Sequence, residues 1–192
     1  MGRWEPDGRS RLVDAAVDLF GERGYEQTTV ADIAGRAGLT ERTFFRHFTD
    51  KREVLFGGGQ QLGEMLVAHV AAAPASTAPL RAIVLALQEA GKEFFEPIRA
   101  NASRRQAIIT AHADLQEREL IKLARITADL AEVLGQRGLD ALTARLAAET
   151  GVAVFKTAFE QWATTDVDST LSELVAQAAQ QLTELTKRSR LR

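Results

Sequence analysis

Residues 28–51 read TTVADIAGRAGLTERTFFRHFTDK, and this stretch decides the fold because it predicts two short helices joined by a glycine turn. Thr29 precedes an apolar run and is followed three residues later by Asp32, a spacing typical of a helix capping box. Gly38 is suited to the left-handed backbone conformation that ends a helix. Thr40 then supplies an N-cap for the second helix.

The second of these helices is basic and rich in aromatic residues. Phe44 and Phe48 are four residues apart and are predicted to face the core. The other positions are predicted to point outward: Glu41, Arg42, Thr43, Phe45, Arg46 and His47. Two short helices with hydrogen-bonding side chains on the second form the helix-turn-helix motif, which enters the major groove of DNA. The sequence therefore predicts a DNA-binding protein.

This stretch and its flanks resemble the DNA-binding signature of the tetracycline-repressor (TetR) family of bacterial transcription regulators. The resemblance is carried by residues 12–20 (LVDAAVDLF), 24–25, 28–30, 33–34, 37–39, 43–48 and 51–55. It implies an all-α fold of about nine helices. Residues 1–52 would be a three-helix, helix-turn-helix DNA-binding domain, and residues 53–192 a helical ligand-binding and dimerisation domain. Two residues depart from the family pattern: Phe45 stands where Tyr is frequent, and Arg42 where a small residue is frequent.

Arg42 and Arg46 are the candidate base-reading residues, because one guanidinium group can bond both O6 and N7 of guanine; the alternative is that they only clamp phosphates. Glu41 would accept a hydrogen bond from cytosine N4, or would only interact favourably with the helix dipole at the N-terminus of the helix. Phe45 would lie against a sugar or a thymine methyl group, or fill the core. The resemblance implies contacts with the DNA backbone for a further set: Thr28, Thr29, Thr40, Thr43, His47 and Lys51. Thr29 and Thr40 have a second sufficient role as helix caps.

Composition narrows the class of protein. The 192 residues suit one or two small domains, and the absence of cysteine excludes disulfides and cysteine metal sites. No apolar run is long enough to span a membrane, so we expect a cytoplasmic protein without membrane association. Residues 1–52 contain nine basic and nine acidic residues. DNA binding would therefore depend on a local basic edge rather than on net charge.

The rest of the chain reads as helices separated by short breaks. The expected helices cover residues 9–23, 50–72, 79–94, 97–111, 114–136, 139–163 and 168–187, in addition to the two short ones. Gly57, Gly58 and Gly59 fall inside the helix expected to begin at Asp50. They would serve close helix packing or a kinked start, form a hinge between the domains, or break the helix. In the family this helix transmits ligand occupancy to the DNA-binding domain. It would be the only covalent path between the ligand-binding domain and the DNA-binding domain.

The last two expected helices carry apolar faces that favour pairing with a second copy of the chain. One face is formed by Leu171, Leu174, Val175, Ala178, Leu182 and Leu185. The alternative is that these faces pack only within their own chain. A homodimer through the last two helices would place two reading heads on one palindromic double-stranded DNA operator.

A pocket for an apolar small-molecule effector is implied between helices four to eight. The candidate lining residues are Leu62, Leu66, Phe94, Phe95, Ile98, Ile108, His112, Phe155, Phe159 and Trp162. Ordinary core packing would use the same residue types. Arg104, Arg105 and His112 would suit an anionic head group, as in a fatty acid or an acyl-coenzyme A.

The sequence favours no catalytic residue, metal site or cofactor. His69, His112 and Asp114 are the only acid–base candidates outside the helix pair, and they form no convincing set. The three consecutive glycines lack the Lys-Ser/Thr that would follow them in a phosphate-binding loop. The sequence therefore predicts a ligand-responsive transcriptional repressor rather than an enzyme. The alternative is a helical dimerisation or adaptor protein that does not bind DNA.

Overall fold

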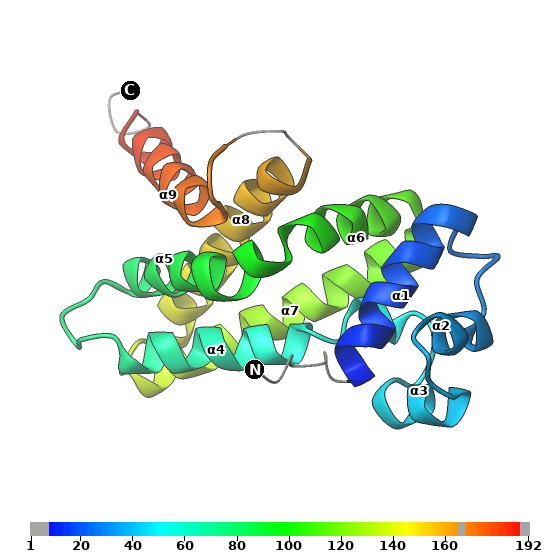
Figure 1. Ribbon diagram of the computed structural model, residues 1–192. Helices are drawn as coiled ribbons and strands as arrows, with labels where there is room; N and C mark the ends of the chain where they lie inside the picture. Colours follow the sequence, from blue (N-terminus) through cyan, green and yellow to red (C-terminus); the bar gives the residue numbers. More distant parts are fainter. Residues whose placement is uncertain (1–7, 165–167, 189–192) are drawn as a thin grey trace, which may run out of the picture. The chain divides into compact units, whose positions relative to one another are not determined.

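The computed structural model describes residues 8–164 and 168–188, and over these ranges the chain is all-α with no β-strand, as predicted. Figure 1 shows the succession of helices. Their bounds are α1 Gly8–Arg23, α2 Val30–Arg36, α3 Glu41–His47, α4 Gly59–Ala72, α5 Pro79–Ala90, α6 Arg99–Ala111, α7 Ala113–Gln136, α8 Ala141–Thr164 and α9 Leu171–Arg188. Three short segments complete the set: the 3-10 turns η1 Glu53–Leu55 and η3 Glu96–Ile98, and the π-helical turn η2 Gly91–Phe95.

The chain divides into two compact units. The first contains the residues up to Gly59 together with Ala100–Glu119, and the second contains Gln60–Arg99 together with the residues from Leu120 onward. The chain therefore passes from one unit to the other after Gly59, after Arg99 and after Glu119. The expectation that the fourth helix is the only covalent path between the two parts is wrong, because α6 and α7 also connect them.

The first unit is built on the apolar face of α1. Leu12 and Leu19 of α1 are fully buried together with Phe44 of α3. Ile109 of α6 and Leu115 of α7 are buried in the same core. Residues nearly one hundred positions away in sequence therefore complete the core beneath the two short helices.

The fourth helix starts later than the sequence indicates. Asp50 does act as a cap, since its Oδ1 accepts hydrogen bonds from the backbone N–H groups of Arg52 and Glu53 at 2.8 and 3.1 Å. Only the short turn η1 follows, and α4 begins at Gly59. Each glycine costs roughly 1 kcal/mol relative to alanine inside a helix. Three consecutive glycines are therefore a physical reason for the break, and they do not lie inside a continuous helix.

In the second unit, α4 and α7 run side by side and α5 packs against α8 and α9 (Figure 1). The Arg137 side chain at the end of α7 donates to the carbonyl oxygens of Ala73 and Pro74 at 3.0 and 2.9 Å. The backbone of Gly91 in η2 approaches the start of α9 so closely that a Cβ atom on it would lie 2.9 Å from the Ser172 nitrogen. This contact between two backbones leaves no room for a side chain at position 91.

The apolar face of α9 has two different environments. Leu171, Leu174 and Val175 are buried within their own chain. Leu182 is half-buried, and Leu185 is 63% exposed. The first half of this face is therefore already used for packing within the chain, and only the second half remains open.

Candidate nucleic-acid interface

Local hydrogen bonds fix both helices of the predicted pair. The Thr29 hydroxyl accepts from the Asp32 N–H at 3.1 Å, and the Asp32 carboxylate accepts from the Thr29 N–H at 2.9 Å. These bonds form the predicted capping box at the start of α2. The Thr29 hydroxyl also donates to the carboxylate, and together these hydrogen bonds lower the pKa of Asp32. The box is therefore fully formed at neutral pH.

The turn between the helices follows the glycine prediction. Gly38 adopts a φ of 64°, in the left-handed region that favours glycine. The next backbone N–H, that of Leu39, donates to the Ala34 carbonyl at 2.8 Å, which closes the end of α2. Thr40 then caps α3, with its hydroxyl accepting from the Thr43 N–H at 3.2 Å.

The exposed surface of α3 carries the four side chains that were singled out for base contacts. Glu41, Arg42, Phe45 and Arg46 are all exposed. Within the described parts of the chain, neither Arg42 nor Arg46 has an ion-pair or hydrogen-bond partner in its own protein. Two guanidinium groups are thus held on a capped helix and are available to an external anion or base edge.

Thr43 and His47, which lie beside that stripe, are half-buried. The Thr43 hydroxyl is 3.1 Å from the Thr40 hydroxyl. The His47 Nε2 atom is buried and has no hydrogen-bond partner among the residues that the structure describes. These two side chains therefore offer less to a ligand than the four exposed ones.

Two of the residues expected to contact the DNA backbone are occupied inside the first unit. Thr28 is buried, and its hydroxyl donates to the Gly24 carbonyl oxygen at 2.9 Å. The Lys51 ammonium donates to the carbonyl oxygens of Tyr25, Glu26 and Thr28 at 2.9, 3.3 and 3.3 Å. Because these bonds satisfy the donors of Lys51, the first role of this side chain is to hold the 25–28 turn.

Several residues that position the helix pair were not singled out as site residues. Arg11 of α1 donates to the Ala37 carbonyl at the end of α2, and Arg9 donates to the Gly57 carbonyl. The Arg9 guanidinium group also lies over the Phe48 ring, 5.5 Å from its centre. Their basic character was visible in the sequence, but their partners become apparent only in the folded chain.

A second group surrounds Phe56 just after η1. The guanidinium groups of Arg105 and Arg118 lie 5.1 and 5.0 Å from the centre of this buried ring. Arg118 forms an ion pair with Glu53 at 2.6 Å. Arg105 pairs with Glu119 at 2.7 Å and donates to the Leu55 carbonyl oxygen. This group, the Phe56 clamp, attaches η1 to α6 and to the first turns of α7.

The predicted effector residues are divided between the two units. Phe95, Phe155, Phe159 and Trp162 pack ring against ring, with centroid distances of 5.3 to 6.1 Å from Phe95 to the other three. Phe94 contacts Phe95, whereas Ile98 is 44% exposed. Leu62 and Leu66 are buried on α4. Ile108 and His112 belong to the first unit, where His112 contacts the Tyr25 ring.

The expectation that Arg104 and Arg105 hold an anionic head group meets a physical obstacle. Arg104 pairs with Asp18 of α1 at 2.6 Å, and Arg105 belongs to the Phe56 clamp. Both guanidinium groups therefore already have carboxylate partners within the first unit.

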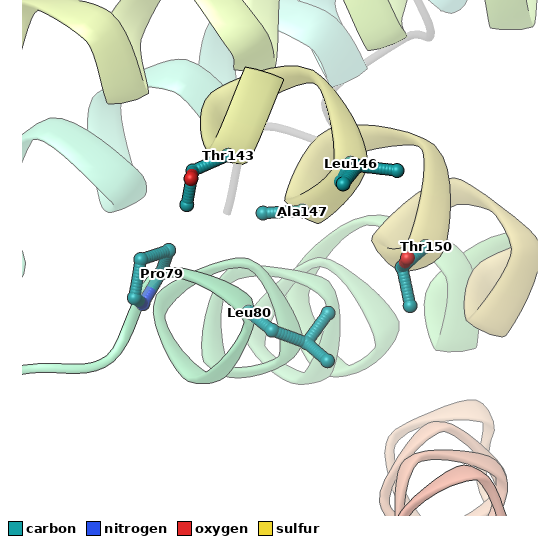
Figure 2. A pocket seen from close by; sticks show the side chains of 6 residues that line it. All are labelled: Pro79, Leu80, Thr143, Leu146, Ala147 and Thr150. Carbon is teal, nitrogen blue, oxygen red and sulfur yellow. The ribbon is translucent and has the colours of Figure 1, made fainter. Parts of the chain in front are cut away.

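An open groove lies elsewhere, between the start of α5 and the first half of α8. Its volume is about 310 Å³, and Figure 2 shows its six lining residues: Pro79, Leu80, Thr143, Leu146, Ala147 and Thr150. Leu146 is 58% exposed, and Leu142 one turn earlier is 70% exposed. None of these residues was among the predicted effector contacts. The groove is mainly apolar, and two of its six lining residues are threonines.

Among the described residues, no group of three or more His, Asp or Glu side chains is arranged to hold a metal ion. Within the same ranges, no helix combines the length and apolarity needed to cross a membrane.

The arrangement of α1, α2 and α3 is that of a helix-turn-helix protein, and known proteins resemble this part of the chain. Residues 12–56 match the family described as "Bacterial regulatory proteins, tetR family". Over this segment the chain is similar to the DNA-binding part of that family.

Similar sequences carry related names. The chain is 40% identical over 75 residues to the HTH-type transcriptional regulator TcmR of Streptomyces glaucescens, a match that covers 39% of this chain and 33% of TcmR. It is 38% identical over 86 residues to the HTH-type transcriptional repressor KstR2 of Rhodococcus jostii, covering 43% of this chain and 42% of KstR2. The matched region thus spans well under half the length of these relatives.

Solved structures match the fold over nearly the whole chain. The fatty acid degradation regulator FadR from Bacillus halodurans superposes with a TM-score of 0.58 at 22% identity, covering 93% of this chain and 95% of that one. The repressor NalD from Pseudomonas aeruginosa gives a TM-score of 0.59 at 20% identity, covering 90% and 96%. At such identities the likeness shows the fold alone.

Proposed function

We propose that this chain is a transcriptional repressor that binds a palindromic DNA operator as a homodimer in the cytoplasm and is released by a small apolar effector. The observation that carries the proposal is the exposed face of α3. It holds the guanidinium groups of Arg42 and Arg46, which have no partner among the residues that the structure describes, on a capped helix within the segment that matches the tetR family. Guanidinium groups are the most frequent readers of guanine in the major groove.

The residues of the proposed DNA surface differ in the exposure of their side chains, and we assign their contacts accordingly. Arg42, Arg46, Glu41 and Phe45 would meet bases, because they are exposed on α3. Thr29 and Thr40 are exposed at helix starts, so that their hydroxyl groups would meet phosphates in addition to capping. Thr43, His47, Lys51 and Thr28 would contribute backbone contacts or positioning, since their side chains are half-buried or buried.

Homodimerisation is proposed through the parts of α8 and α9 that remain open. Leu142 and Leu146 of α8 and Leu185 of α9 are large apolar side chains that are more than half exposed. A second copy would cover such surfaces symmetrically, which is the usual way in which homodimers form. The two reading heads would then reach successive major grooves, roughly 34–36 Å apart.

An apolar effector is proposed for the second unit. The supporting observation is the aromatic cluster of Phe95, Phe155, Phe159 and Trp162, which could repack around an apolar chain. A structure of similar fold, the FadR of Thermus thermophilus, is described as a complex with lauroyl-CoA, at 21% identity and a TM-score of 0.57 over 92% of this chain and 93% of that one. Lauroyl-CoA is therefore a reasonable first probe.

Operator selection from random double-stranded DNA tests the function. We expect enrichment of a palindrome whose affinity falls steeply with salt concentration, because phosphate contacts release counterions. A matched protein carrying Arg42→Ala and Arg46→Ala should enrich no such sequence while keeping the melting temperature of the unmodified chain. If the unmodified protein enriches nothing, the chain is better described as a helical dimerisation or adaptor protein.

A further inference from the structure

Phe45 is the one large hydrophobic residue that is exposed among the described residues of the first unit. Its side chain is 55% exposed, whereas every other large hydrophobic residue that is exposed in the described ranges belongs to the second unit. An isolated exposed phenyl group is not unusual by itself. This one lies on α3, in the middle of the surface that carries Arg42 and Arg46.

The side chain of Phe45 packs against a buried neighbour. Phe44 is fully buried, and its ring meets the Phe45 ring edge to face, with 5.5 Å between centroids and 82° between planes. Phe48 is also buried and anchors the end of the same helix. Phe45 lies four residues after Glu41 and three after Arg42, so that the three side chains share one helical face.

The chemistry of the phenyl group restricts what it can read. It has no polar atom, so it cannot hydrogen-bond a phosphate or the donor and acceptor atoms of a base edge. In the major groove, the apolar feature that differs between bases is the 5-methyl group of thymine. The carbon atoms of the deoxyribose are also apolar, but they are the same in every nucleotide.

We propose that Phe45 selects thymine at one symmetric pair of operator positions by packing its phenyl ring on the 5-methyl group. The proposal rests on the proposed function, because it assigns one part of the specificity of the same DNA surface. It gives Phe45 a role distinct from that of the neighbouring arginines, which would read guanine.

The test uses the full-length protein and its selected operator, with each thymine replaced in both half-sites by deoxyuridine, which lacks only the methyl group. Burial of one methyl-sized group changes affinity roughly fourfold, so we expect about a fifteenfold loss for the symmetric pair at one position. Phe45→Ala should bind the thymine and uracil operators equally. Arg46→Ala should still bind the thymine operator about fifteenfold more tightly than the uracil operator. With 5-methylcytosine at the same operator position, the unmodified protein should bind more tightly than with cytosine.

The outcomes separate this proposal from the function on which it rests. If the unmodified protein binds thymine and uracil operators equally at every position, while Phe45→Ala still weakens binding, Phe45 contacts the sugar and the proposal is overturned. If the ratio survives in Phe45→Ala, another residue reads the methyl group. A protein that binds no operator at all overturns the proposed function itself. Melting curves of Phe45→Ala should match those of the unmodified protein, because the side chain is exposed.

Discussion

The Lys51 ammonium nitrogen lies 4.4 Å from the centre of the Tyr25 ring and also donates a hydrogen bond to the Tyr25 carbonyl oxygen at 2.9 Å. One cation therefore holds both the side chain and the backbone of the residue that begins the turn before α2. The Tyr25 ring is buried and makes further ring contacts with Phe20 and His112. This aromatic residue connects α1 with the boundary between α6 and α7, all within the first unit.

The Tyr25 phenol provides a spectroscopic probe of that packing. Burial, assisted by the nearby charge of Asp114, raises its pKa from 10.0 to about 12. Tyr25 is the only tyrosine in the sequence, so ultraviolet titration of the phenolate reports this group alone. We expect a midpoint near pH 12 in the folded protein and near pH 10 in denaturant. A midpoint near 10 in the folded protein would show that the ring is solvated.

The same pKa shift gives a pH dependence of stability with a definite sign. Above about pH 10 the unfolded chain loses the Tyr25 proton while the folded chain keeps it, so the unfolded state is favoured. The free energy of unfolding should therefore fall as the pH rises from 10 to 12. Tyr25→Phe, compared at each pH by urea titration, should lose this component of the slope.

Gly91 and Gly135 form a matched pair for testing the close approach of η2 to α9. A Cβ atom at position 91 would lie 2.9 Å from a backbone nitrogen of α9, whereas one at position 135 would meet nothing within 4 Å. We expect Gly91→Ala to lower the free energy of unfolding by roughly 1–3 kcal/mol. Gly135→Ala, in the last turn of α7, should leave it unchanged or raise it by up to about 1 kcal/mol. Equal effects in urea unfolding would contradict the close contact.

The Phe56 clamp should contribute more to the free energy of unfolding than an exposed ion pair does. We expect Arg118→Met to lower the free energy of unfolding by about 1–3 kcal/mol, because it leaves Glu53 without its partner and removes a cation from the Phe56 ring. Arg145→Met breaks the exposed pair with Glu149, and its cost should stay below about 0.5 kcal/mol. A double-mutant cycle with Glu53→Gln would isolate the ion-pair part.

Exposed leucines give a cleaner test of the dimer than buried ones. Substituting Leu174 would disturb the chain's own core, since this side chain is only 3% exposed. Leu146→Glu with Leu185→Glu should instead yield a folded monomer, because burial of each leucine contributes about 2 kcal/mol to association and a carboxylate opposes it. Leu85→Glu on α5 is the control and should remain dimeric in sedimentation. An unchanged dimer in the double variant would locate the interface elsewhere.

Arg46 should determine which base is preferred, not only how tightly DNA binds. We expect Arg46→Ala to change the selected base at one symmetric pair of operator positions, at a cost of roughly 1–3 kcal/mol per base. Arg36→Ala is the control: this exposed arginine of α2 is paired with Glu22 at 2.7 Å, and its loss should keep the preferred sequence. Uniform weakening across all sequences in Arg46→Ala would make that residue a phosphate clamp.

The sequence predicted those parts of the fold that depend on neighbouring residues. The capping box of Thr29 and Asp32, the cap at Thr40 and the left-handed Gly38 each involve partners within a few positions, and all three are confirmed. The helix ends near residues 23, 111 and 136 were also predicted closely, since glycine and short polar segments follow them.

The features that were mispredicted or missed depend on residues far apart in sequence. An apolar residue such as Ile109 follows the same helical pattern whichever core it enters, so its place beneath α1 could not be read from periodicity. The acceptors of Lys51 are 23 to 26 residues away in sequence. The start of α4 differs from the prediction for another reason: Asp50 caps only the short turn η1, because the glycines that follow interrupt the helix.

The contribution of α6 and α7 to the first core limits how such proteins can exchange parts. A chimaera that replaced only residues 12–56 would set a foreign α1 on the native Ile109 and Leu115, and would separate Glu53 from the Arg118 with which it is paired. A compatible transplant would have to carry residues 100–119 as well. The part of this chain that folds as one unit with α1, α2 and α3 is therefore discontinuous in sequence.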